Sequence, residues 1–94
     1  MKVIEIVQYQ SSTSEKRLME KNEQMQDFLT AQPGFIERYL ASSESCWIDL
    51  VLWEDMESAT NAASTMMQQA FAAEFMSLID TDSIVMQHME IKNS

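Results

Sequence analysis

The stretch that decides the fold is Cys46-Trp47-Ile48-Asp49-Leu50-Val51-Leu52-Trp53-Glu54. It is dense in aliphatic, β-branched and aromatic residues, which favour an extended strand. A short polar connection at 42–45 separates it from another alternating run at 35–42. Because so short a loop allows only neighbouring strands to pair, the two runs predict an antiparallel hairpin.

Helical and extended patterns flank this hairpin on both sides. Residues 2–10 alternate as a strand, and Ser12 with Glu15 forms a capping-box pattern at the start of a helix. This helix should end before Pro33-Gly34, which hold the chain's single proline and single glycine. After the hairpin, Asp55 is expected to cap a second helix.

The second helical region carries a stripe of small residues, followed by a run of larger apolar ones. The small residues are Ala59, Ala62, Ala63 and Ala70. They let a helix lie close to a sheet, and a break is expected near Gln68-Gln69. A polar turn at 80–83 and a last strand at 84–91 complete the chain.

The resulting order is strand, helix, strand, strand, helix, strand. With right-handed crossovers it predicts an α+β fold of the ferredoxin-like βαββαβ kind. Its four-stranded antiparallel sheet would carry the helices on one face. At 94 residues the chain is expected to form a single domain, residues 1–94.

Composition excludes several classes of protein. Fifteen acidic residues against six basic ones give a net charge of −9, which disfavours nucleic-acid binding. No apolar run approaches the roughly 18–20 residues of a membrane span, and no secretion signal is visible at the first residues. With Cys46 as the single cysteine, we expect a cytoplasmic protein without disulfides.

The second face of the sheet, without helices, decides the expected assembly. We predict that the strand at 46–53 turns Cys46, Ile48, Leu50 and Leu52 toward the helices. The outward set would then comprise Trp47, Asp49, Val51, Trp53, Ile84, Met86, His88, Glu90, Glu37 and Tyr39, together with Glu5, Val7 and Tyr9. Such a face covers roughly 500 Å². Because tryptophans in water are costly, a homodimer packed sheet against sheet is expected.

Two short motifs carry a resemblance to a known family. They are Gln32-Pro33-Gly34-Phe35 and Val51-Leu52-Trp53-Glu54-Asp55. With the alanines that follow, the chain resembles the antibiotic-biosynthesis-monooxygenase-like family of the dimeric α/β barrel superfamily. The resemblance implies a barrel closed by dimerisation, a ligand cavity in each subunit, and oxygenase chemistry that uses neither metal nor flavin, hence no cofactor. The haem-degrading pattern of the superfamily is not matched.

The resemblance and the residue types together nominate a site. In the polyketide-oxidising members, a strand asparagine and a tryptophan four residues later line the cavity; here Asp49 and Trp53 occupy those positions. An aspartate cannot donate the hydrogen bond of that amide. His88, the only histidine, is the expected general base, and Asp49 its orienting partner or a second acid.

The expected substrate-binding residues are aromatic. Trp53, Tyr39 and Trp47 would form a wall against which a small aromatic or hydrophobic ligand stacks. The structural alternatives are a histidine held at the dimer interface, aromatic residues serving only as core, and an Asp49 paired with Arg38 or Tyr39. The residue spacing predicts no metal site.

Three functions are compatible with these residues. The first is a cofactor-independent monooxygenase-like enzyme that removes a proton from a small aromatic or quinol substrate, which then reacts with oxygen. The second is a non-catalytic homodimer that binds a small hydrophobic ligand. The third is a lactone or tautomer isomerase that uses the same base.

Overall fold

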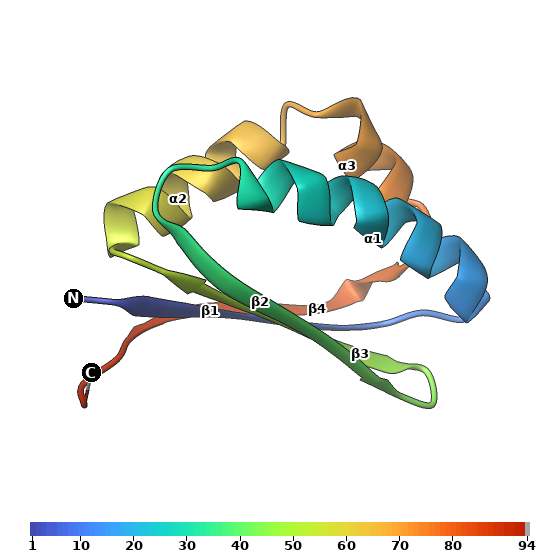
Figure 1. Cartoon of the computed structure of the whole chain (residues 1–94). Coiled ribbons are helices and arrows are strands. Elements are labelled where there is room, and N and C mark those ends of the chain that lie inside the picture. The colour runs from blue at the N-terminus through green and yellow to red at the C-terminus, as the bar shows by residue number, and fades with distance from the viewer. Residues whose placement is uncertain (94) are drawn as a thin grey trace.

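The computed structural model describes residues 1–93 and shows two layers, a sheet and the helices that cover one of its faces (Figure 1). The elements in chain order are β1 (Val3–Gln10), α1 (Glu15–Thr30), β2 (Phe35–Ser43), β3 (Cys46–Trp53), α2 (Met56–Met66), α3 (Ala70–Met76) and β4 (Asp80–Glu90). All strand pairs are antiparallel, in the order β2-β3-β1-β4. The predicted ferredoxin-like α+β fold is confirmed.

Local signals place the helix ends. Asp55 caps α2 as predicted, with its carboxylate accepting from the Ser58 N–H at 2.7 Å. Helix α1, in contrast, is capped by Ser14, which accepts from the Arg17 N–H at 3.3 Å, so the predicted cap at Ser12 is wrong. The segment before α1 is held by another hydrogen bond, which the Ser11 hydroxyl donates to the Leu78 carbonyl at 2.6 Å.

The turn between α1 and β2 depends on the single glycine. Gly34 has a φ of +85°, a region that disfavours residues with a side chain. A Cβ placed there would lie 2.2 Å from the Ser58 hydroxyl oxygen. The Gly34 carbonyl also accepts from the Glu54 N–H at 2.8 Å, which fixes the end of α1 beside the start of α2.

The second helical region divides as expected. Helix α2 ends at Met66 and α3 begins at Ala70, so the break falls at Gln68-Gln69 as predicted. The last strand starts earlier than predicted, at Asp80 rather than residue 84. There the Ser83 hydroxyl accepts from the Gln10 N–H at 2.8 Å, which extends the contact of β4 with β1.

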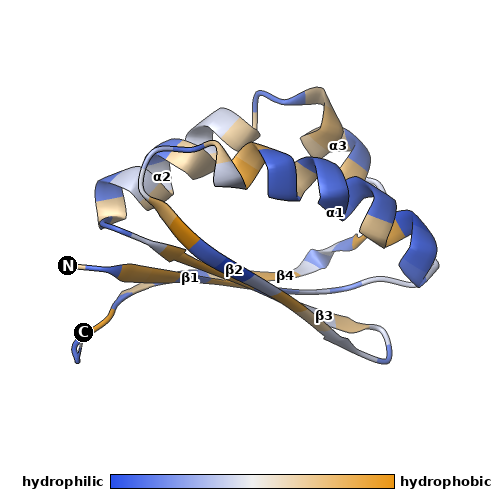
Figure 2. Cartoon of the chain, viewed as in Figure 1, coloured by the Kyte–Doolittle hydropathy of each residue, from blue (hydrophilic) through white to orange (hydrophobic). Residues whose placement is uncertain are grey.

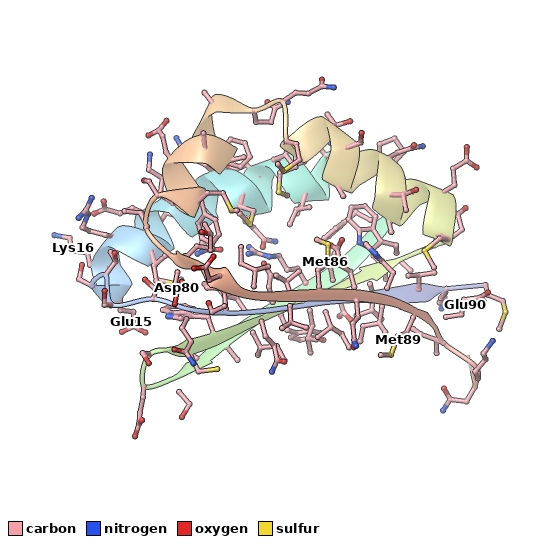
Figure 3. The ribbon with its side chains drawn as sticks, turned by 180° about the vertical axis from the view of Figure 1, so that it is seen from behind. Glu15, Lys16, Asp80, Met86, Met89 and Glu90 are labelled. Atoms are coloured by element: carbon pink, nitrogen blue, oxygen red, sulfur yellow. The ribbon has the colours of Figure 1, made fainter. Side chains whose placement is uncertain are left out.

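The sheet faces are the reverse of the prediction. Trp47, Asp49, Val51 and Trp53 are all buried beneath the helices, as are Val3, Glu5 and Tyr9 of β1. Cys46 is exposed on the opposite side. In β4, Met86 points toward the helices and Met89 away from them (Figure 3). Only Glu37 and Tyr39 of the predicted outward set lie outside.

The reversal has a physical reason. Both sets of alternating residues in β3 are apolar, and exchanging their faces moves every side chain of the strand together. The small residues Ala59 and Ala62 of α2 are fully or almost fully buried, so the helix leaves space for the large ring of Trp53. Arg38 pairs with Asp49, which removes the objection to burying that acid.

Apolar residues, orange in Figure 2, recur along the strands, and the face without helices carries many of them. We call it the outer face and define it by residues from three strands and Tyr39 of β2. Its members are Ile4, Ile6, Tyr39, Ile48, Leu50, Leu52, Val85 and Met89. No helix within residues 1–93 is long and apolar enough to cross a membrane.

Candidate functional site

A cavity of about 270 Å³ lies between the inner face of the sheet and the helices. Its walls are mainly aliphatic, aromatic and methionine side chains from β1, β3, β4 and all three helices. Among them are Val7, Met25, Leu29, Val51, Met66 and Phe75. Apolar pockets with a few polar groups are the usual form of small-molecule sites, commonly about 300–1,000 Å³. This cavity therefore suits a small ligand.

Four polar side chains interrupt the apolar wall. They are Glu5 and Tyr9 of β1 together with Asp49 and Trp53 of β3. Each is at most 7% exposed. The Tyr9 hydroxyl and the Trp53 indole N–H find no hydrogen-bond partner among residues 1–93. Because buried donors are nearly always paired, these two groups are unusual.

Glu5 makes the contact of the cavity that is best suited to proton transfer. Antiparallel pairing of β1 with β4 places it directly opposite His88, and 2.6 Å separates Glu5 Oε2 from His88 Nε2. Burial raises the pKa of the Glu5 carboxyl, and the hydrogen bond and charge of His88 oppose that rise. A carboxyl whose pKa is raised by burial, hydrogen-bonded to an imidazole, can accept and pass on a proton.

Asp49 is held by a different partner. The Arg38 Nε and Nη2 atoms donate to its two oxygens at 2.9 and 2.7 Å. Arg38 also donates to Asn22 at 2.7 Å and to Gln26 at 3.1 Å. Of the alternatives left open by the sequence, the pairing of Asp49 with Arg38 is thus present.

The geometry separates Asp49 from His88. Asp49 lies opposite Val7 on one side of β1, whereas His88 lies opposite Glu5 on the other side. His88 stands behind Glu5 rather than on the cavity wall. The predicted orienting contact between Asp49 and His88 is therefore wrong, and Glu5 takes that place.

The three predicted aromatic residues have different surroundings. Trp53 lines the cavity and packs edge-on against Phe35, with ring centroids 5.9 Å apart. Trp47 is buried and parallel to Tyr9, at a centroid distance of 6.4 Å. Tyr39 is 55% exposed on the outer face. The predicted common wall of these three residues is not formed, because β2 turns Tyr39 to the opposite side of the sheet.

Glu5 and Tyr9 are the site residues that the sequence analysis missed. The predicted outward set includes both residues, because the alternation of β1 is apolar on either side. A usable signal was nevertheless present. Glu5 is a lone acid within an apolar strand, as Asp49 is, and such acids need a partner when they are buried.

A hollow of about 340 Å³ lies at the other end of the sheet, lined by Gln10, residues 11–13, Ser45 and residues 77–80. Its Ser11 and Thr13 hydroxyls already donate to the Leu78 carbonyl. Among residues 1–93, no three His, Cys, Asp or Glu side chains gather closely enough to hold a metal ion.

Comparison with known proteins yields matches through the fold only. No protein-family model matches the chain. No curated protein matches its sequence either. Solved structures do match over nearly the whole length.

The structural matches include a cofactor-independent oxygenase. SnoaB of Streptomyces nogalater has a TM-score of 0.81 at 13% identity, covering 99% of this chain and 95% of its own. A candidate antibiotic biosynthesis monooxygenase of Chloroflexus aurantiacus J-10-fl has a TM-score of 0.75 at 13% identity, covering 100% of this chain and 96% of its own.

A third solved structure also matches. A dimeric ferredoxin-like protein of unknown function from Jannaschia sp. CCS1 has a TM-score of 0.72 at 12% identity, covering 97% of this chain and 100% of its own. Identities this low establish the fold and not the activity. The chain has the fold of antibiotic-biosynthesis-monooxygenase-like proteins, as its sequence motifs predicted.

Proposed function

We propose that this protein is a homodimeric, cofactor-independent monooxygenase-like enzyme acting on a small aromatic phenol or quinol. The observation that carries the proposal is the Glu5–His88 pair at the wall of an apolar cavity. The likeness to SnoaB, described as a cofactor-independent oxygenase, supports it. An acid–base pair at the wall of an apolar cavity suits the first step of such a reaction, which is removal of a proton from the substrate.

In the proposed mechanism, Glu5 and His88 act as one base. The Glu5 carboxylate takes the proton from the substrate hydroxyl, and His88 stabilises or receives that proton through the 2.6 Å contact. His88 thus keeps the role of general base predicted for it, but it works through Glu5. The resulting phenolate is electron-rich enough to reduce oxygen.

The overall reaction balances without a cofactor. A carbon of the aromatic anion binds molecular oxygen and becomes a hydroperoxide after protonation. Loss of water from that hydroperoxide leaves a ring carbonyl, so phenol and oxygen become quinone and water. Both electrons needed to reduce the second oxygen atom come from the substrate.

Other cavity residues receive supporting roles. Trp53 is proposed to contact the ring of the substrate, and Trp47 to hold Tyr9 in place by packing against it. Asp49 is proposed as a fixed charge at the cavity wall, oriented by Arg38. Tyr39 is assigned to the dimer and not to substrate binding, because it lies on the outer face.

The outer face supports the proposed homodimer. Val85 and Tyr39 are more than half exposed in the isolated chain, and Met89 is 46% exposed. The same face carries the aliphatic residues of β1 and β3. Apolar patches of this extent commonly mark protein interfaces, and a two-fold axis would let identical faces cover each other.

Oxygen uptake tests the enzymatic proposal. Purified protein is mixed with a panel of phenols and quinols in an oxygen-electrode cell. We expect turnover for a subset, with Glu5→Gln and His88→Phe each slower by at least about a hundredfold, the usual contribution of a general base. Glu90→Gln is the matched control, because Glu90 lies on the same strand with its side chain exposed.

Two other outcomes would replace the oxygenase proposal. Ligand-dependent increases in Tm without oxygen uptake, unchanged by His88→Phe, would indicate a non-catalytic binding protein. Exchange of substrate protons with solvent, without oxygen uptake, would indicate an isomerase that uses the same base. Equal oxygen uptake by the wild type and Glu5→Gln would remove the proposed base.

A further inference from the structure

The cavity holds two buried donors that no residue among 1–93 satisfies with a hydrogen bond of ordinary geometry. The Tyr9 hydroxyl and the Trp53 indole N–H both line it, and Tyr9 is 3% and Trp53 0% exposed. An unpaired buried polar group destabilises a fold by about 1–3 kcal/mol. A ligand that accepts hydrogen bonds from both would remove this penalty, which makes them candidates for ligand recognition.

The two donors belong to opposite ends of the cavity. Tyr9 lies four residues beyond Glu5 on β1, a separation of roughly 13 Å along the strand. The Trp53 indole N–H faces Glu5 and lowers the pKa of that carboxyl through a hydrogen-bonding contact, but the contact falls short of ordinary hydrogen-bond geometry. One end therefore offers an acceptor and a donor side by side, and the other end offers the Tyr9 donor.

The Tyr9 hydroxyl is suited to donate rather than to ionise. Burial, helped by the negative charge of Asp49, raises the pKa of Tyr9 to about 12. Tyr9 is thus neutral at physiological pH and keeps its proton. Asp49 is a less available acceptor at this end, since Arg38 already donates to both of its oxygens.

The charge of the cavity restricts the ligand further. Glu5 and Asp49 both line the wall, and the whole chain carries a net charge of −9. The positive charge of Arg38 is already bound to Asp49. A carboxylate ligand would enter a cavity with two carboxyl groups and no unpaired guanidinium, which is unfavourable.

From these positions we infer that the cavity selects an uncharged two-ring aromatic ligand with a hydroxyl at one end and a carbonyl at the other. The hydroxyl donates to Glu5 and accepts from Trp53, and the carbonyl accepts from Tyr9. The volume of about 270 Å³ lies just below the usual range of small-molecule pockets and suits a compact ligand such as two fused rings. The inference rests on the proposed function only in taking this cavity as the substrate site.

Binding measured without oxygen separates this inference from turnover. The probe is a hydroxytetralone whose hydroxyl and carbonyl lie at opposite ends of its two fused rings. Its controls are the tetralone without the hydroxyl, the hydroxytetralin without the carbonyl, and a hydroxynaphthoic acid. Calorimetric titration of the wild-type protein under nitrogen should rank the hydroxytetralone first and the acid last.

Two variants test which protein donor contacts each end of the ligand. Tyr9→Phe should weaken binding of the hydroxytetralone and the tetralone by about two- to tenfold, the effect of one neutral hydrogen bond. It should leave the affinity for hydroxytetralin unchanged. Trp53→Phe should weaken hydroxytetralin as well as hydroxytetralone. Tm values of both variants show whether each is folded, and Tyr9→Phe removes a single unpaired oxygen, so it should fold.

Several outcomes would overturn the inference. The inference fails if all four probes bind equally well or if the acid binds most tightly. It also fails if Tyr9→Phe weakens ligands with and without the carbonyl to the same extent. If the predicted ranking holds and no phenol supports oxygen uptake, the oxygenase proposal fails while the ligand assignment stands. If oxygen is consumed with substrates whose binding ignores Tyr9, the ligand assignment fails alone.

Discussion

The two faces of the sheet are both apolar, but they are built for different purposes. The inner face carries large rings, small helix residues above them, and four polar groups around a cavity. The outer face carries mainly aliphatic side chains and few polar or ionisable groups. The polar residues, rather than the degree of hydrophobicity, therefore distinguish a binding face from a packing face.

The strongest destabilisation is expected from a substitution on the inner face. Trp53 is fully buried, so Trp53→Ala should lower the free energy of unfolding by about 3–5 kcal/mol. Chemical denaturation followed by circular dichroism measures it. The loss should not depend on protein concentration, because the ring packs within one chain. A Leu52→Ala control on the outer face should show a smaller loss that grows with concentration.

A buried ion pair provides the next test. Replacing Arg38 by Met leaves Asp49 buried without its partner, which should destabilise the protein by about 3 kcal/mol. The double variant Arg38→Met with Asp49→Leu should recover most of that loss, since both charges are then absent. Urea unfolding of Arg38→Met, Asp49→Leu and the double variant measures the coupling. Additive effects of the two substitutions would show that the pair is not coupled.

The dimer proposed to form through the outer face can be tested by a substitution at its centre. Leu50 lies between Ile6 of β1 and Tyr39 of β2, near the centre of the proposed interface. Leu50→Asp would bury a charge against the partner copy and should weaken the dimer by about 2 kcal/mol or more, at least thirtyfold. Sedimentation velocity measures it, and unchanged circular dichroism shows that each chain stays folded. A wild-type protein that is monomeric at micromolar concentration would contradict the proposed homodimer.

The sequence predicts the fold well and the faces poorly, for one physical reason. Strand and helix periods, the Asp55 cap and the glycine after α1 are local signals, and each determines its own element. Which side of β3 meets the helices is decided by packing between distant residues. Because Ile48 and Leu50 are as apolar as Val51, alternation alone could not choose between the two sides.

The same difference between local signals and long-range packing applies to the candidate site. His88 and Asp49 could be nominated from residue type, since a lone histidine and a lone acid in apolar strands need partners. Their actual partners could not be predicted. Glu5 meets His88 through the register of β1 with β4, and Arg38 reaches Asp49 from the neighbouring strand. Register depends on the whole sheet, so only the structure pairs these residues.

The smallest expected effect concerns the pH dependence of stability at Glu5. Burial raises its pKa in the folded chain above the usual value of 4.5. The folded state then holds this proton more tightly than the unfolded state. The contribution to stability is fully present below about pH 4.5 and is lost as the pH rises through the folded pKa.

Glu5→Gln should remove this part of the pH dependence, because a glutamine does not titrate in that range. Urea midpoints measured between pH 4 and pH 8, in about 0.1 M salt to limit surface charge effects, compare the two proteins. The wild type should lose stability relative to Glu5→Gln as the pH rises. Glu37→Gln, on the exposed outer side of β2, should instead run parallel to the wild type. If Glu5→Gln also runs parallel, the carboxyl is not desolvated, and the inner face loses the property that separates it from the outer one.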